Sequence, residues 1–303
     1  MTATLPDTAR ESSGQSLLRS ATTMTYDPIV DIDWDAPLEP DRYFMPPHRS
    51  SLYGTALWEQ MPEPQRIELT KHEMASIASI GIWFETILMQ MLIRRAYDRD
   101  PRSANIQFTY TEVGDECRHS VMFAKLVDKL DAPYYRPAKA LHRGGRALKT
   151  ISNGSMCFAG ALFVEEILDQ FQREAMVDGT LQPLVRAVSR VHVVEEARHM
   201  RFAREEAAAE FGEQGRLSRE WSKLIIGATA NLASTQLIHP HVYTNVGLDS
   251  REARAAAAAN PNWQESRKWA ARRVRETLEE THMITGPGKF LWKRAGLLGA
   301  PAA

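Results

Sequence analysis

The chain has 303 residues and a mass of 34.2 kDa, enough for one large domain or two small ones. Its 37 basic and 38 acidic residues nearly cancel, which argues against nucleic acid as a partner. There is no run of 18 apolar residues and no basic N-terminal region followed by an apolar stretch, so neither a membrane span nor a secretory signal is predicted. The two cysteines, Cys117 and Cys157, lie in apolar helical contexts and suit a reducing cytoplasm, which is the expected location.

The N-terminal region does not have the pattern of a helical domain. Residues 1–25 are rich in Ser, Thr and Ala, and we expect a disordered tail. Residues 26–61 form the next segment, whose part up to residue 54 contains five prolines and scattered aromatic residues. Proline disfavours a helix whereas aromatic side chains favour burial, so this segment is predicted to be an extended arm packed on the domain.

Helical periodicity dominates residues 62–285, and residues 286–303 are expected to be a C-terminal tail. Helices are predicted at 63–98, 103–131, 144–178, 181–211, 217–237 and 262–282, with a loop between the last two. Four long helices joined by short turns indicate an all-α fold, a four-helix bundle with additional C-terminal helices. No second domain is predicted.

The sequence repeats itself with an offset of 80 residues. Asp115-Glu116-Cys117-Arg118-His119 matches Glu195-Glu196-Ala197-Arg198-His199, so the second acid, the Arg and the His coincide. The same offset places residues 82–90 over 162–170, where Glu, Ile, Leu and Gln coincide without a gap. The first two long helices and the next two therefore form a tandem pair of helical hairpins.

Each hairpin combines one Glu with a Glu-x-x-His pair, the pattern of a metal half-site. Residues i and i+3 project together from a helix, and a Glu from the neighbouring helix completes the set. Two such half-sites describe a ferritin-like di-iron or di-manganese centre. The alternative is a set of ordinary salt-bridged helix faces. Four buried carboxylates without a cation would cost several kcal/mol each, roughly, and this favours metal.

Two positions need a separate argument. Glu165 and Glu166 are adjacent, but Glu165 matches Glu85 under the offset and shares a face with apolar residues, so Glu165 is the expected ligand. His192 lies four residues before Glu196, on one stripe with it. A lone His on an apolar face is usually a structural core residue, but this stripe points at the predicted metals. A third Glu-x-x-His, Glu279/His282, has no Glu partner upstream and is expected to be a surface coincidence.

At these residues the chain resembles the AurF-like di-iron N-oxygenases, a ferritin-like family named for a p-aminobenzoate N-oxygenase. The resemblance assigns seven metal ligands, namely Glu85, Glu116, His119, Glu165, His192, Glu196 and His199. It implies two iron ions per chain, with manganese as the alternative metal. It further implies that O2 oxidises an amine to a hydroxylamine, and on to nitroso and nitro products, through a peroxo-diferric intermediate. The di-iron centre itself is the catalytic group, and no separate acid or base is assigned.

Other residues are expected to support this centre. Asp115, Glu195, Arg118 and Arg198 are candidates to hold the ligand histidines, with a buried ion-pair network as the alternative. Arg272 and Arg273 are candidates to bind a substrate carboxylate, with a solvated helix face as the alternative.

Three functions remain open from the sequence: an N-oxygenase, a di-iron C–H hydroxylase or desaturase, and ferritin-like iron storage. The chain has no G-x-G-x-x-G motif and no Cys cluster, so an external electron donor is the expected partner, besides O2 and a small-molecule amine. A monomer or a homodimer is expected for an oxygenase and a many-subunit cage for storage.

Overall fold

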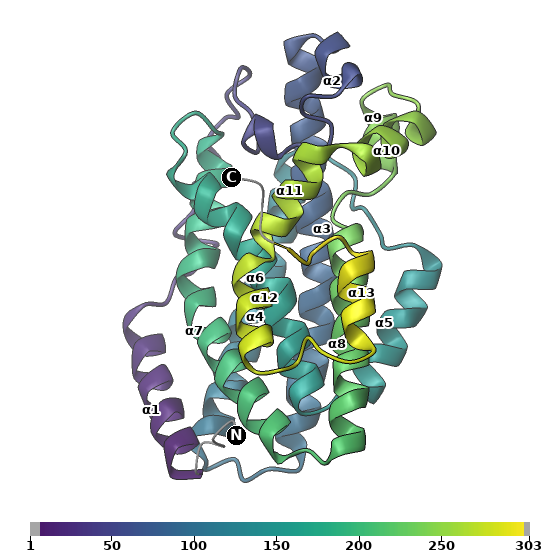
Figure 1. The fold of residues 1–303 in the computed structure, drawn as a ribbon. Coiled ribbons are helices and arrows are strands. Elements are labelled where there is room, and N and C mark those ends of the chain that lie inside the picture. Colours follow the sequence, from purple (N-terminus) through teal and green to yellow (C-terminus); the bar gives the residue numbers. More distant parts are fainter. Residues whose placement is uncertain (1–6, 300–303) are drawn as a thin grey trace.

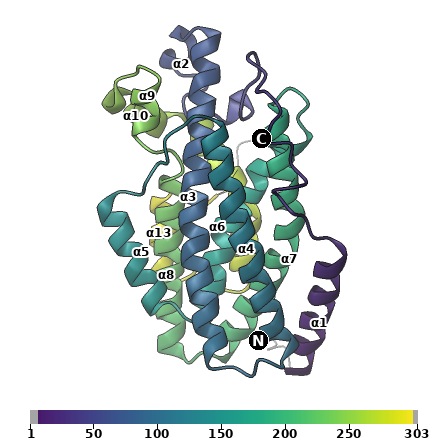
Figure 2. The same ribbon diagram turned by 180° about the vertical axis from the view of Figure 1, so that it is seen from behind.

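The computed structural model describes residues 7–299 and is all-α, with no strand among them (Figure 1). Four long helices form the core: α3 (Glu63–Tyr97), α4 (Ala104–Lys129), α6 (Ser155–Val177) and α7 (Pro183–Glu213). Helices α3 and α4 form one hairpin, α6 and α7 form the other, and the views from both sides show the two hairpins packed together (Figure 2). The predicted all-α, ferritin-like bundle is confirmed.

Local sequence explains where the core helices begin and end. Pro183 occupies the first turn of α7, where its missing N–H costs nothing. Helix α3 ends at Tyr97, shortly before Pro101. The predicted single helix over 144–178 is wrong, because α5 (Lys139–Ile151) ends before α6 begins. Gly154 separates them with a φ of 51°, a left-handed conformation that favours glycine.

The predicted disorder of residues 1–25 is wrong for the part that the structure describes, because Asp7–Thr23 forms helix α1. Residues 1–6 lie outside the described region. Helix α1 buries Leu17 and Ala21 against the bundle. Its Gly14 lies so close to the backbone of Ala104 that an added Cβ would come within 2.7 Å of it. Tertiary contacts of this kind, rather than helix propensity, explain why a segment rich in Ser and Thr is helical.

The extended arm was predicted at 26–61; residues 24–55 contain only the 3-10 turn η1 (Pro47–Arg49), whereas the short helix α2 (Ala56–Gln60) occupies the end of the predicted range. The arm buries Ile32, Phe44 and Leu52. It therefore packs on the domain through apolar side chains.

The C-terminal part adds helices around the bundle: α8 (Arg216–Thr235), α9 (His241–Asn245), α10 (Ser250–Ala259), α11 (Pro261–Ala270), α12 (Arg272–Glu280) and α13 (Gly288–Arg294). The segment expected to be one helix over 262–282 is divided between α11 and α12. Helices α9 and α10 occupy the predicted loop, where Asp249 caps α10 by accepting a hydrogen bond from the Glu252 N–H. The predicted tail contains α13, whose Trp292 is fully buried, while residues 300–303 lie outside the described region.

Among the described helices, α3 alone is long and apolar enough to cross a membrane by length and composition. Of the 18-residue apolar window of α3 that meets this criterion, 72% is buried inside the protein. The central helix of a bundle is expected to be buried in this way.

Candidate metal centre

The structure places all seven predicted ligands in one layer of the bundle, between its four core helices. Glu85 comes from α3, Glu116 and His119 from α4, Glu165 from α6, and the remaining three from α7. Each of the seven is at most 3% exposed. They form three overlapping groups in which the donor atoms lie within 4.8 Å of one another: Glu116, His119, Glu196 and His199; Glu85, His119 and His192; and Glu165, His192 and Glu196.

Glu116 and Glu196 lie between the histidines of the two hairpins. The Glu196 Oε1 atom is 3.0 Å from His199 Nδ1 and 3.2 Å from His119 Nδ1. The two oxygens of Glu116 are 3.3 Å from His119 Nδ1 and 3.2 Å from His199 Nδ1. Each carboxylate therefore faces ligand atoms of both half-sites, which is the position of a carboxylate that bridges two metal ions.

His192 differs from a satisfied core histidine. Its side chain is fully buried, yet neither ring nitrogen has a hydrogen-bond partner among the described residues. Its Nε2 atom is 3.6 Å from both Glu85 Oε1 and Glu196 Oε1. Burial lowers the pKa of His192 to about 4, so the ring is neutral at neutral pH and free to coordinate a metal.

The carboxylates also lack the partners that buried acids require. Glu85 Oε1, Glu165 Oε2 and Glu196 Oε2 are buried and have no hydrogen bond within the described part of the chain. Burial, together with repulsion from Glu116, raises the pKa of Glu85 well above its ordinary value, and burial and repulsion from Glu196 do the same for Glu165. Four carboxylates and three imidazoles, in which each carboxylate and His192 have atoms without a hydrogen bond among the described residues, fit two iron or manganese ions.

Two further acids contact the ring nitrogens of His119 and His199 that face away from the centre. Each acid belongs to the opposite hairpin from the histidine that it contacts. His119 Nε2 of α4 lies 2.9 Å from Glu195 Oε2 of α7, and His199 Nε2 of α7 lies 3.0 Å from Asp115 Oδ2 of α4. Each carboxylate accepts a hydrogen bond from the Nε2–H group of its histidine, which leaves the Nδ1 lone pair directed at the centre. The geometry is therefore the same in both halves.

Two arginines connect these acids with each other. Arg198 lies 3.4 Å from Asp115 and 3.8 Å from Glu195. Arg118 pairs with Asp115 and lies 3.6 Å from Glu195. The four predicted supporting residues therefore form one network around the histidines, which fits both roles considered from the sequence.

Backbone atoms of the arm and the side chain of a serine also contact these residues. The Tyr26 N–H donates to Glu195 Oε1 at 3.0 Å, and Arg198 donates to the carbonyl oxygen of Met24 at 2.7 Å. Ser120 donates to Glu85 Oε2 at 2.9 Å. The two arm contacts use backbone atoms, which carry no sequence signature. Ser120 could have been found only from its place one helical turn from Glu116.

The structure places the side chains of Glu165 and Glu166 in different surroundings. Glu165 faces the ligand cluster, whereas Glu166 Oε1 lies 2.6 Å from Arg204 Nη2, a side chain that is 45% exposed. The register of the repeat therefore identifies the residue that faces the centre.

The remaining candidates lie away from this layer. Arg272 and Arg273 are exposed on α12, and Arg273 Nη1 is 3.9 Å from Asp169 Oδ2. His282 is exposed at the end of α12, which agrees with a surface coincidence. The structure does not bring these arginines to the candidate metal centre.

Comparison with known proteins agrees with this geometry. Residues 7–282 match the family described as P-aminobenzoate N-oxygenase AurF. The chain is 26% identical to the uncharacterized protein Mb0909 of Mycobacterium bovis and to the uncharacterized protein Rv0885 of Mycobacterium tuberculosis, over 95% of this chain and 87% of each relative. The matched family is a di-iron family, and the buried Glu and His clusters could hold its metals. The chain belongs to the AurF family.

Proposed function

We propose that the protein is a di-iron N-oxygenase that uses O2 to oxidise an amine to a hydroxylamine. The observation that carries the proposal is the convergence of seven buried donor residues, including His192 with both ring nitrogens unpartnered, in a chain of the AurF family. A ferritin-like storage site made of two Glu and Glu-x-x-His half-sites requires six of these residues. The seventh favours an oxygenase.

The reaction balances with an external donor. One amine, one O2, two electrons and two protons give one hydroxylamine and one water, with a new N–O bond and cleavage of the O–O bond. Two ferrous ions would supply the electrons to O2 and would be reduced again by the donor. Further rounds would give nitroso and nitro products.

The residues of the chain hold the centre and exclude water from it. Asp115 and Glu195 keep the Nδ1 atoms of His199 and His119 directed inward. Glu116 and Glu196 face both half-sites and would contribute to holding both ions. The burial of the whole layer keeps bulk water away from the reacting oxygen.

The test combines metal analysis with isotope labelling. The iron-loaded, reduced protein is mixed with oxygen-18 labelled O2 and a panel of amines, and the products are analysed by mass spectrometry. We expect about two metal ions per chain and one labelled oxygen bound to nitrogen. Label on carbon would indicate a C–H hydroxylase, and O2 consumption by a large assembly without any labelled product would indicate storage. Either result would overturn the proposal.

A further inference from the structure

A cavity lies on the bundle axis directly beside the metal-ligand layer. All four core helices contribute to its inner end, and each contributes a residue one turn from a ligand. These residues are Gly81 before Glu85, Phe123 after His119, Leu168 after Glu165, and Ser189 before His192. The Phe123 ring also contacts the His192 ring, with centroids 4.9 Å apart. The inner end of the cavity therefore lies next to the metal-ligand layer, and all four core helices line it.

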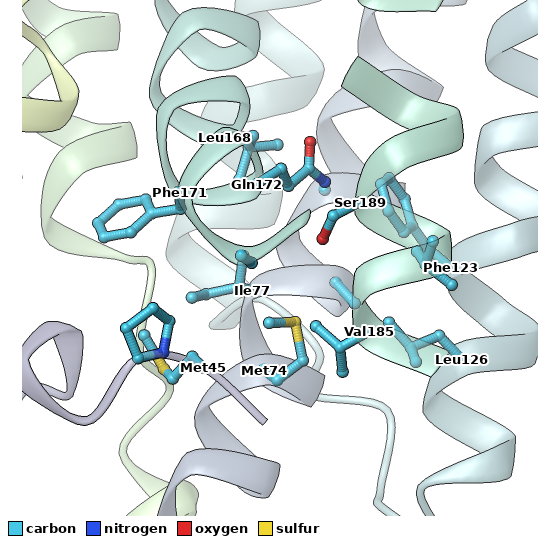
Figure 3. Close-up of a pocket in the computed structure, with 15 residues that line it drawn as sticks. Met45, Met74, Ile77, Phe123, Leu126, Leu168, Phe171, Gln172, Val185 and Ser189 are labelled. Atoms are coloured by element: carbon cyan, nitrogen blue, oxygen red, sulfur yellow. The ribbon is translucent and has the colours of Figure 1, made fainter. Parts of the chain in front are cut away.

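The lining of this axial cavity carries no charged side chain. Most lining residues are apolar, among them Ile77, Leu126, Phe171 and Val188. Gln172 of α6 and Ser189 of α7 are the polar exceptions, and Figure 3 shows Gln172 reaching toward Ser189. The Gln172 Oε1 atom is buried and has no hydrogen-bond partner among the described residues. The cavity thus offers mainly apolar contact, with the Gln172 amide and the Ser189 hydroxyl as its polar groups and Gln172 Oε1 as a buried acceptor without a partner among the described residues.

The cavity has a volume of about 30 Å³, which is smaller than an aromatic ring requires. The other end is lined by Met45, from the arm, and Met74, from α3 (Figure 3). Both are flexible, unbranched side chains that adapt to a ligand by changing rotamer. A change of rotamer at these two side chains would enlarge this end of the cavity.

We propose that the axial cavity binds the body of the substrate and that this substrate is an uncharged amine with an apolar body. This inference rests on the proposed N-oxygenase function. The amine nitrogen would pass Gly81 toward the metal layer, and a hydrogen-bond donor on the body would meet Gln172. An ionised carboxylate would be buried without a cationic partner, which disfavours it strongly. The aminobenzoate of the family description is such an anion.

A second cavity provides the internal comparison. It lies beside α3 and α6, is lined by Phe84, Met156, Gly160, Glu165 and Thr229 among others, and also has a volume of about 30 Å³. It reaches one predicted ligand, Glu165, from the side. Gly160 lines this lateral cavity as Gly81 lines the axial one, and at both positions an added Cβ would make its first contact at an ordinary 3.7 Å. The two glycines are therefore a matched pair for mutation.

The first experiment compares ligands that differ only in charge and polarity. Binding of p-toluidine, 4-aminobenzamide and 4-aminobenzoate to the iron-loaded full-length chain is measured by calorimetry without O2 at neutral pH. We expect p-toluidine to bind about 100-fold more tightly than 4-aminobenzoate, because only the latter buries a charge. The uncharged amide, whose N–H group can donate to Gln172, should also bind more tightly than 4-aminobenzoate. Equal or tighter binding of 4-aminobenzoate would overturn the proposal.

The second experiment locates the site. Gly81→Leu should abolish p-toluidine binding, and Gly160→Leu should leave it unchanged; the reverse result would assign the substrate to the lateral cavity. Metal content and melting temperature verify that each variant is folded. Should Gly81→Leu fail to fold, Met74→Arg offers a gain of function, because a cation at the partly exposed Met74 position should strengthen 4-aminobenzoate binding relative to p-toluidine. No such gain would overturn the assignment.

Turnover separates the two proposals. If binding follows the expected order but no amine gives a hydroxylamine, the N-oxygenase proposal fails and the cavity assignment stands. If 4-aminobenzoate is N-oxygenated as efficiently as p-toluidine, the cavity assignment fails and the N-oxygenase proposal stands.

Discussion

The hairpin α3–α4 and the hairpin α6–α7 carry the same ligand pattern but differ in the side chains around it. His119 and His199 bond equivalent acids of the opposite hairpin at 2.9 and 3.0 Å. At the position where α7 has His192, α4 has Glu112, which is buried with its Oε2 atom unpartnered among the described residues. Burial raises the pKa of Glu112 to about 8, so its carboxyl group is largely neutral at pH 7.

A second difference concerns the single glutamates. Ser120 donates a hydrogen bond to Glu85, whereas Met200 stands at the equivalent position of the other hairpin and Glu165 Oε2 has no partner in the described chain. The repeated residues therefore explain why two metal ions can be held. The residues that differ would make two bound metal ions unequal, and His192 is the largest of these differences.

The strongest test of the shared pattern removes a carboxylate that faces both half-sites. Glu116→Ala should lose most of both metal ions, because Glu116 contacts the histidines of both hairpins. Glu196→Ala, its equivalent in the other hairpin, should behave in the same way. Metal content per folded chain measures this. Wild-type metal content in either variant would show that these residues do not bridge two ions.

The next test concerns the single glutamate of α6. Glu165→Ala should lose about one ion per chain, because Glu165 belongs to one half-site only. Glu166→Ala is the matched control. It should keep the metal, because its carboxylate pairs with Arg204 and lies outside the ligand groups. The opposite result would mean that the register of the repeat assigns the wrong residue.

Substituting the two acids that contact the histidines should have a smaller effect on metal binding. The effect should be equal for the two acids. Asp115→Asn and Glu195→Gln keep the size of the side chain but remove the charge that orients the imidazole. Each should weaken metal binding by roughly 10–100-fold. Competition with a chelator measures the affinity. A large loss in one variant alone would show that the two halves are not equivalent at this level.

The smallest effect on stability is expected at the residue that breaks the symmetry. His192→Phe keeps the ring volume and removes two nitrogens that have no hydrogen bonds to lose. The metal-free variant should therefore unfold within about 1 kcal/mol of the wild type, whereas a hydrogen-bonded core histidine would cost about 1–3 kcal/mol. Iron should still bind, and N-oxygenation should fall sharply. Lower stability with full activity would mean that His192 is structural.

The sequence predicts the core of the fold well because apolar periodicity is strong there. Helix α3 was expected at 63–98 and is found at Glu63–Tyr97. Six of the seven candidate ligands come together because the 80-residue repeat fixes their register, and the same register favours Glu165 over Glu166. His192 has no histidine counterpart in the repeat and was predicted from its spacing to Glu196.

Features that depend on tertiary contacts were not predictable. Helix α1 was missed because Leu17 and Ala21 become stabilising only when they pack on the bundle. The contacts of Met24 and Tyr26 use backbone atoms, and the axial cavity depends on how four helices meet. The proposed substrate cavity could therefore not be located from the sequence, and the candidate residues Arg272 and Arg273 are exposed on α12.

The most direct test of the central claim is an anomalous-scattering map, at the iron edge, from crystals of the iron-loaded protein. We expect two peaks per chain about 3.5–4 Å apart, both in contact with Glu116 and Glu196, and His192 bound to only one of them. A single peak, or two peaks with His192 bound to neither, would contradict the account of a duplicated half-site made unequal by one added histidine.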